Sequence, residues 1–124
     1  MSTVLVIEDD ADLLSMMETF LGRRGWSVLK ASGGQEGLRL AREASPDIVL
    51  CDVTLPDLDG FELARRLSAE GPRPPVVFIS GNRRQAEDIV RGLEGGGHGY
   101  ILKPVDLRII HAKLEAVLRA VKGG

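Results

Sequence analysis

The sequence predicts an α/β domain in which helices cover both faces of a parallel β-sheet, a doubly wound three-layer sandwich. Short apolar runs rich in β-branched residues alternate five times with stretches whose apolar residues recur every three or four positions. The helical stretches are about 10 to 15 residues long, a length that connects parallel strands through right-handed crossovers. Polar residues follow the ends of the apolar runs, where ligands bind in such sheets.

Length and composition favour one folded unit. The chain has 124 residues, of which 44% are hydrophobic and 27% are charged, so it can bury a core without disulfide bonds or structural metals. We therefore expect residues 1–124 to form a single domain. The net charge of −2 gives no electrostatic reason to expect direct binding of nucleic acid.

Cysteine content and the length of the apolar runs indicate the compartment. Cys51 is the single cysteine, which excludes an internal disulfide bond and a cysteine metal site, and we expect a buried apolar role for it. The N-terminus enters a strand without a basic leader, and no apolar run approaches the roughly 18–20 residues of a membrane span. These features predict a cytoplasmic protein that does not enter a membrane.

The first strand and the first helix are predicted before Gly25. Val4–Ile7 is a continuous apolar run, typical of a strand that is buried on both faces. Asp10 follows this strand, and we expect its side chain to face the next helix or water. The apolar stripe of that helix consists of Leu13, Leu14, Met17, Phe20 and Leu21.

The second and third strands enclose a second helix. Trp26–Ala31 is predicted as a strand, with Trp26 packing in the core. Ser32 and Gln35 have the spacing of a capping box, which predicts the start of the second helix. The "SPD" of residues 45–47 ends that helix, and Ile48–Cys51 is the third strand.

Turn and cap residues divide the second half of the chain. Pro56 and Gly60 mark residues 54–60 as a loop, in which Asp57 and Asp59 are loop or capping residues. A third helix follows this loop. The two later strands are predicted at Val76–Ile79 and Tyr100–Lys103, and the caps of the two later helices at Asn82 and Asp106.

The last helix has the longest apolar stripe. We expect its apolar residues to face the sheet, whereas His98 and His111 are expected to be single surface histidines without a ligand partner. The stripe consists of Ile109, Ile110, Leu114, Val117, Leu118 and Val121.

Polar side chains at the strand ends predict one site. Five strands with this alternation fit the flavodoxin-like strand order 2-1-3-4-5, in which the first and third strands are neighbours at the switch point. Glu8 and Asp9 follow the first strand, and Asp52 follows the third. These three acids should therefore converge, flanked by Ser80 and Lys103 from the ends of the fourth and fifth strands.

Such a cluster has a chemical use. Several carboxylates without a thiolate or an imidazole make an all-oxygen site that suits Mg²⁺, and Mn²⁺ fits the same ligands. Lys103 and Ser80 can hold the oxygens of a phosphate group. Asp52 is then placed as a nucleophile towards phosphorus in a metal-assisted phosphoryl transfer.

Four segments resemble the signature blocks of two-component response regulator receiver domains. They are "VLVIEDD", "VLCDVTLPDLDG", "VVFISGN" and "YILKP", in family order over about residues 3–121. The resemblance implies that Asp52 is the phosphoacceptor, which takes a phosphoryl group from a histidine kinase or a histidine phosphotransfer protein. It implies that Asp9 is a direct Mg²⁺ ligand, that Glu8 acts through water, and that the Thr54 backbone carbonyl is the third protein ligand.

The resemblance also implies a conformational switch. Ser80 matches the switch hydroxyl, Tyr100 the aromatic switch, and Lys103 the family lysine, with Pro104 after a cis peptide bond. The switch would change the conformation of the face formed by the fourth helix, the fifth strand and the fifth helix. This face would contact an unknown output domain or target protein. The chain would promote only its own phosphorylation and dephosphorylation, and would not be an enzyme for a separate substrate.

Some positions depart from the family pattern. Glu8 stands where Asp is commoner, Gly81 is smaller than the usual alanine, and Val105 replaces a common phenylalanine. Residues 95–99 contain four glycines, which predicts a mobile end to the fourth helix.

Two alternatives remain open at this point. A Mg²⁺-dependent aspartyl-phosphate phosphohydrolase of the dehalogenase-like type shares the acids, the hydroxyl and the lysine. Such enzymes need a second acid two residues after the nucleophile, where this chain has Thr54. The other alternative is a receiver that docks to its partner without phosphorylation.

Overall fold

Five parallel strands form one sheet in the order β2-β1-β3-β4-β5 in the computed structural model, which describes residues 2–71, 73–92 and 97–123. The strands are β1 (Thr3–Ile7), β2 (Ser27–Ala31), β3 (Ile48–Asp52), β4 (Val76–Ser80) and β5 (Gly97–Leu102). The helices are α1 (Ala11–Arg23), α2 (Gly34–Ala44), α3 (Gly60–Ala69), α4 (Arg83–Gly92) and α5 (Leu107–Gly123). The predicted fold class and strand order are confirmed.

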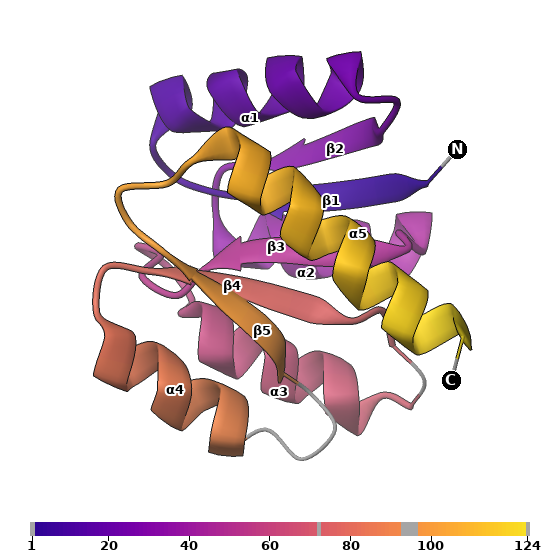
Figure 1. The fold of residues 1–124 in the computed structure, drawn as a ribbon. Coiled ribbons are helices and arrows are strands. Elements are labelled where there is room, and N and C mark those ends of the chain that lie inside the picture. Colours follow the sequence, from indigo (N-terminus) through magenta and orange to yellow (C-terminus); the bar gives the residue numbers. More distant parts are fainter. Residues whose placement is uncertain (1, 72, 93–96, 124) are drawn as a thin grey trace.

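Helices lie on both faces of the sheet, with α1 and α5 on one side and α2, α3 and α4 on the other (Figure 1). Successive residues of a strand point to opposite faces, so the apolar run of β1 supplies both cores. Val4 and Val6 pack with residues of α1 and α5, whereas Leu5 and Ile7 pack with residues of α2 and α3. All four side chains are fully buried.

Four of the described helices begin with a side-chain cap. Asp59, Asn82 and Asp106 were predicted as capping residues, and Asp106 accepts from the N–H of Arg108 in the first turn of α5. Asp10 was expected to face α1 or water. Asp10 accepts hydrogen bonds from the backbone N–H groups of Asp12 and Leu13 at the start of α1. Asp59 caps α3, and Asn82 accepts from the N–H of Gln85 in the first turn of α4. Each carboxylate or amide oxygen satisfies N–H groups that have no partner within the helix.

The predicted capping box of α2 is wrong. The N-cap residue is Gly33, which has no side chain, and the Asp57 carboxylate accepts from the N–H groups of Gly34 and Gln35 at 2.8 and 3.0 Å. A Cβ on Gly34 would lie 2.5 Å from the Leu58 carbonyl oxygen. The glycine pair therefore lets the loop after β3 approach the start of α2, and Asp57 fastens it there.

β5 begins three residues earlier than predicted. Gly97 pairs with Val76 and Gly99 with Val77, so β5 carries one extra residue between them, as in a β-bulge. Gly99 has a φ of +154°, a conformation that residues with a side chain rarely adopt. The glycines thus start a strand that side-chain patterns could not reveal. The predicted mobility of the end of α4 concerns residues 91–99, of which 93–96 lie outside the described residues, and it stays a prediction.

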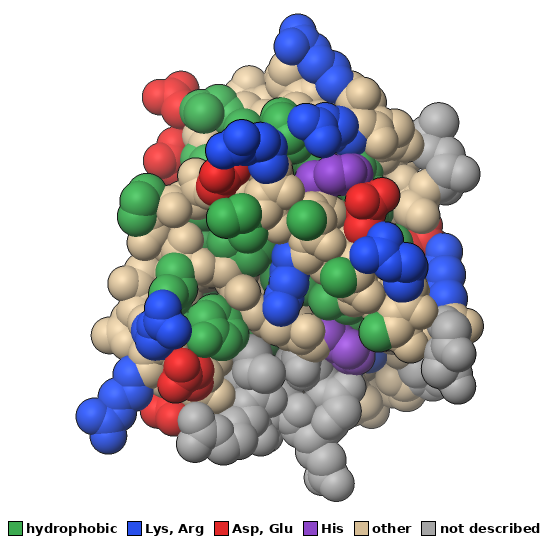
Figure 2. Space-filling view, in the orientation of Figure 1, with side chains coloured by type: hydrophobic (Ala, Val, Ile, Leu, Met, Phe, Trp, Pro, Cys, Tyr) green, Lys and Arg blue, Asp and Glu red, His purple; other side chains and the backbone are tan. Residues whose placement is uncertain are grey.

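α5 buries only part of its predicted stripe. Ile110, Leu114, Val117 and Leu118 are buried, but Ile109 and Val121 are 58% and 46% exposed. Ile109 points about 100° away from Ile110 around the helix axis, and Val121 lies in the last turn. Figure 2 shows hydrophobic side chains among charged groups of both signs on the face that α5 crosses. Among the described helices, none is both long and apolar enough to span a bilayer.

His111 is not the lone surface histidine that we predicted. It is half-buried, and its Nδ1 atom accepts a hydrogen bond of 2.9 Å from the indole N–H of Trp26. Its Nε2 atom lies 3.2 Å from a carboxylate oxygen of Glu115. This contact joins α5 to the residue that precedes β2, far from it in the sequence.

Replacing Asp10 with alanine should lower the free energy of unfolding by about 1 kcal/mol, because two N–H groups of α1 lose their acceptor. Urea unfolding in the presence of EDTA measures this loss without a contribution from bound cations. Asp10→Asn is the matched control, since it removes the charge but keeps a capping oxygen. Equal losses in the two variants would show that Asp10 does not act as a cap.

Candidate functional site

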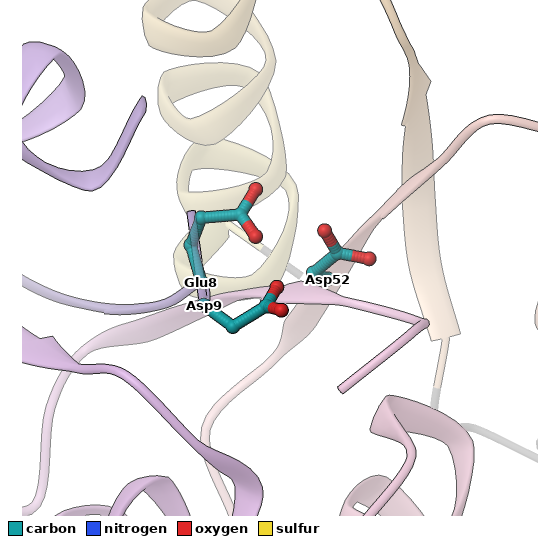
Figure 3. A group of neighbouring side chains, drawn as sticks. All are labelled: Glu8, Asp9 and Asp52. Carbon is teal, nitrogen blue, oxygen red and sulfur yellow. The ribbon is translucent and has the colours of Figure 1, made fainter. Parts of the chain in front are cut away.

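The three acids predicted to converge do so at the carboxyl edge of the sheet. Glu8 and Asp9 follow β1, Asp52 ends β3, and these two strands are neighbours. One carboxylate oxygen from each residue lies within 4.8 Å of the others. Figure 3 shows the three carboxylates gathered around one space. Glu8 and Asp52 are buried, whereas Asp9 is exposed, so the cluster opens to solvent on the side of Asp9.

Lys103 neutralises part of this charge. Its ammonium nitrogen lies 2.7 Å from Asp52 Oδ2 and 3.6 Å from Glu8 Oε1. Its backbone N–H donates to the Ser80 carbonyl oxygen at 2.9 Å, which holds the residue beside the end of β4. Desolvation lowers the pKa of Lys103, but the hydrogen bond to Asp52 and the charges of Asp52 and Glu8 outweigh it, so the pKa lies above its ordinary value.

Glu8 is the strained member of the cluster. Its side chain is completely buried, and burial, followed by the hydrogen bond to Asp52 and the charge of Asp52, raises its pKa from 4.5 to about 7. The charge of Lys103 opposes this rise. Without a cation, Glu8 therefore keeps its proton to a higher pH than an ordinary glutamate does, up to about pH 7.

A divalent cation fits the residues present. Within the described part of the chain, Glu8 Oε1 is a buried oxygen without a hydrogen-bond partner, and such atoms are rare in folded proteins. Glu8, Asp9 and Asp52 offer only oxygen ligands, the type that Mg²⁺ and Mn²⁺ prefer. The set is thus complementary to a hard cation in both charge and ligand chemistry.

The loop after β3 fixes the orientation of Asp52. The Thr54 N–H donates to Asp52 Oδ1 at 2.8 Å, while Lys103 bonds Oδ2. Gly60 closes the loop through its N–H to the Val53 carbonyl oxygen, and a Cβ at Gly60 would lie 2.6 Å from the Asp52 carbonyl oxygen. A role of the Thr54 carbonyl as a metal ligand stays a prediction.

Ser80 and Tyr100 bond towards α4. The Ser80 hydroxyl accepts from the Asn82 N–H and lies within hydrogen-bond distance of the Asn82 carbonyl and Gln85 Oε1. The Tyr100 hydroxyl donates to Glu87 Oε1 at 3.2 Å. The structure therefore gathers the acids and Lys103 around one space and ties the other two predicted residues to the helix beside it.

Sequence reasoning missed several residues around the site. The sequence predicts Asp57 as a loop or capping residue but not that it caps α2, and it does not single out Gln85 or Glu87. Only the predicted helix start at Asn82 could have placed Gln85 near Ser80, because Gln85 then lies in the first turn of α4, directly after the end of β4. Cys51 is buried as predicted, and burial raises the pKa of its thiol above the ordinary value.

A groove of about 590 Å³ lies beside the loop after β3 and the start of α4. Its lining includes Thr54 and Phe61 from one side and Asn82 and Gln85 from α4. A larger hollow of about 690 Å³, lined by residues such as Trp26 and Lys122, lies near the amino ends of β1 and β2, at the opposite edge of the sheet. Of these two hollows, the groove beside Thr54 is the one at the same edge of the sheet as Asp52, although none of the three clustered acids lines it.

Comparisons with known proteins agree with this geometry. A family model described as response regulator receiver domain matches residues 4–115. Over 119 residues the chain is 40% identical to transcriptional regulatory protein AfsQ1 of Streptomyces coelicolor, covering 96% of this chain and 52% of the relative. The chain thus spans about half the length of that relative and of several others.

Other similar proteins match over their full length. Protein PilH of Pseudomonas aeruginosa is 35% identical, with 95% of this chain and 98% of PilH covered. A crystal structure of a CheY-like response regulator receiver domain protein from Methanospirillum hungatei has a TM-score of 0.88 and 28% identity, covering 100% of this chain and 99% of the other.

The titration of Glu8 gives a test of the site without any ligand. Between pH 4.5 and about 7, the unfolded carboxyl loses its proton while the folded one keeps it. The folded state then binds more protons, so the contribution of Glu8 to stability falls as pH rises through this window. Urea unfolding in EDTA from pH 5 to 8 should show a decline that is smaller in Glu8→Gln, whose side chain does not titrate. Parallel curves for the two proteins would show that Glu8 has an ordinary pKa.

Proposed function

Because the chain belongs to the response regulator receiver domain family of two-component systems, we propose that it is a phospho-accepting switch with Asp52 as the acceptor. The observation that carries this proposal is the pairing of Asp52 with Lys103 inside the cluster of acids. Asp52 is only 2% exposed, yet one oxygen meets an ammonium group and the other a backbone N–H. A nucleophile held in this way is ready for an in-line displacement at phosphorus.

The proposed reaction transfers one phosphoryl group. An Asp52 carboxylate oxygen attacks the phosphorus atom, the bond from phosphorus to the donor nitrogen or oxygen breaks, and the donor leaves with the electron pair. The Lys103 ammonium then stabilises negative charge on the phosphoryl oxygens, and the Thr54 N–H keeps the second carboxylate oxygen in place. Attack by water on the acyl phosphate returns free Asp52 and inorganic phosphate.

The cluster would hold a divalent cation for this reaction. Glu8, Asp9, Asp52 and the Thr54 carbonyl are the proposed protein ligands, with Glu8 acting through water. Bound Mg²⁺ would supply charge neutralisation for the transferred group, and Mn²⁺ could take the same place. The buried oxygen of Glu8 without a hydrogen-bond partner supports this part of the proposal.

The phosphoryl donor would be a histidine kinase or a histidine phosphotransfer protein. Since such kinases draw their phosphoryl group from ATP, the proposal sets the chain in the cytoplasm. Phosphorylation would then shift the conformational equilibrium of the face made by α4, β5 and α5. This face would contact an output domain or a target protein. The lengths of two relatives support both kinds of contact. AfsQ1 is about twice as long as this chain, which leaves room for an output domain, whereas PilH is about as long as this chain and would act on a separate target.

Acetyl phosphate with Mg²⁺ should add one phosphoryl group to the wild-type chain and none to Asp52→Asn, because an amide cannot act as the nucleophile. Intact-mass spectrometry measures the product. Asp12→Asn, which changes an exposed acid in the first turn of α1, is the control and should be labelled normally. Equal labelling of Asp52→Asn would refute the acceptor assignment, and repeated turnover of a phosphate ester would favour the phosphohydrolase alternative.

Mg²⁺ should raise the melting temperature of the wild-type chain, because it binds the folded cluster and not the unfolded chain. At a free concentration 100 times the dissociation constant, the gain in unfolding free energy is about 2.7 kcal/mol. Asp9→Asn should reduce the rise at a fixed Mg²⁺ concentration, whereas Asp12→Asn should keep it. A melting temperature that ignores millimolar Mg²⁺ in the wild type would contradict the proposed metal site.

A further inference from the structure

Two side chains of α4 hold the two residues that the proposed switch would move. Gln85 Oε1 lies 3.2 Å from the Ser80 hydroxyl, and Glu87 Oε1 lies 3.2 Å from the Tyr100 hydroxyl. Ser80 ends β4 and Tyr100 belongs to β5, so the two bonds tie α4 to two neighbouring strands. Each bond pairs a hydroxyl donor with a side-chain oxygen.

The bond to Gln85 competes with a phosphoryl group for the Ser80 proton. A hydroxyl has one proton to donate, and at Ser80 it points to either the Asn82 carbonyl or Gln85 Oε1. The hydroxyl oxygen also accepts from the Asn82 N–H. Ser80 is 2% exposed, so water does not readily replace a lost partner. To donate to a phosphoryl oxygen on Asp52, Ser80 must therefore release its partner at the start of α4.

The bond to Glu87 fixes the ring of Tyr100. The ring is half-buried and packs against the core on the α2 and α3 side of the sheet, while the hydroxyl reaches the α4 carboxylate. A hydrogen bond to an ionised acceptor is stronger than one between neutral groups. Rotation of the ring away from α4 would therefore have to break this bond.

We propose that Gln85 and Glu87 are positioning residues, two latches that stabilise the unphosphorylated conformation by holding Ser80 and Tyr100 against α4. This inference rests on the proposed function and names the residues that set its resting equilibrium. Because both latches start from one helix, a shift of α4 relative to β4 and β5 strains them together. Removal of either latch raises the fraction of chains in the conformation that binds a phosphoryl group.

The size of the effect follows from the strength of one hydrogen bond. A net contribution of about 0.5 to 1.5 kcal/mol corresponds to a change of roughly two- to tenfold in a conformational equilibrium. The apparent affinity for a ligand of the minor conformation rises by the same factor while that conformation stays rare. If both latches oppose the same transition, their effects multiply in the double variant.

Beryllofluoride with Mg²⁺, a stable mimic of the aspartyl phosphate, provides the test. Tyr100 is the single tyrosine of the chain, so 3-fluorotyrosine labelling gives one ¹⁹F resonance that reports the ring environment and the binding curve. Gln85→Met and Glu87→Ala should each bind beryllofluoride two- to tenfold more tightly than wild type. The resonance of free Glu87→Ala should also move towards its position in the saturated wild-type complex.

Matched variants separate a latch from a structural role. Gln35→Met changes the other glutamine of the chain, and Asp88→Ala removes the acid next to Glu87; both should bind beryllofluoride like wild type. Glu87→Gln keeps an oxygen acceptor and should fall between wild type and Glu87→Ala. A residue that only supports the fold would lower the melting temperature without tightening binding.

The outcomes distinguish this inference from the proposed function. Unchanged or weaker beryllofluoride binding by both Gln85→Met and Glu87→Ala, with the tyrosine resonance at its wild-type position, would overturn the latch assignment while the acceptor role of Asp52 stands. Failure of the wild type to bind beryllofluoride would refute the proposed function, and the latches with it.

Discussion

One ammonium group facing two buried carboxylates is the interaction on which the site depends. Lys103 meets Asp52 directly and Glu8 at a longer distance. Burying charged groups costs free energy that only close opposite charges and hydrogen bonds can offset. A single cation cannot offset two carboxylates, so the site keeps an excess of negative charge. Burial, the hydrogen bond to Asp52 and the charge of Asp52 together raise the pKa of Glu8 to about 7, and the excess of carboxylates makes the cluster complementary to a divalent cation.

Four of the five strands assemble this charge arrangement. Glu8, Asp52 and Lys103 come from the ends of β1, β3 and β5, and β4 lies between the last two. The backbone bond from Lys103 to Ser80 anchors the chain after β5 to the end of β4. Because parallel strands place their carboxyl ends on one edge, residues scattered over most of the sequence meet in a space of a few ångströms. The Lys103–Pro104 peptide bond is cis, as the resemblance implied.

The acids could be predicted because they interrupt apolar patterns at strand ends, and strand order alone then brings them together. Other contacts depend on how distant segments approach, which the local pattern does not encode. Asp57 caps a helix that begins 23 residues before it, and His111 meets Trp26 across 85 residues. The start of β5 was missed for a different reason, since glycines carry no side chain whose periodicity could mark a strand.

The same excess of negative charge gives a physical reason for the proposed switch to involve α4. Without a phosphoryl group, a proton on Glu8 or a divalent cation in the cluster relieves the repulsion. A phosphoryl group on Asp52 would add further negative oxygens beside Glu8, and one proton could not balance them. Additional donors would then have to turn towards the site, and the Ser80 hydroxyl is the neighbouring donor whose present partners belong to the start of α4. In this way, the excess negative charge that Lys103 leaves unbalanced would change the contacts of α4, although Lys103 itself lies after β5.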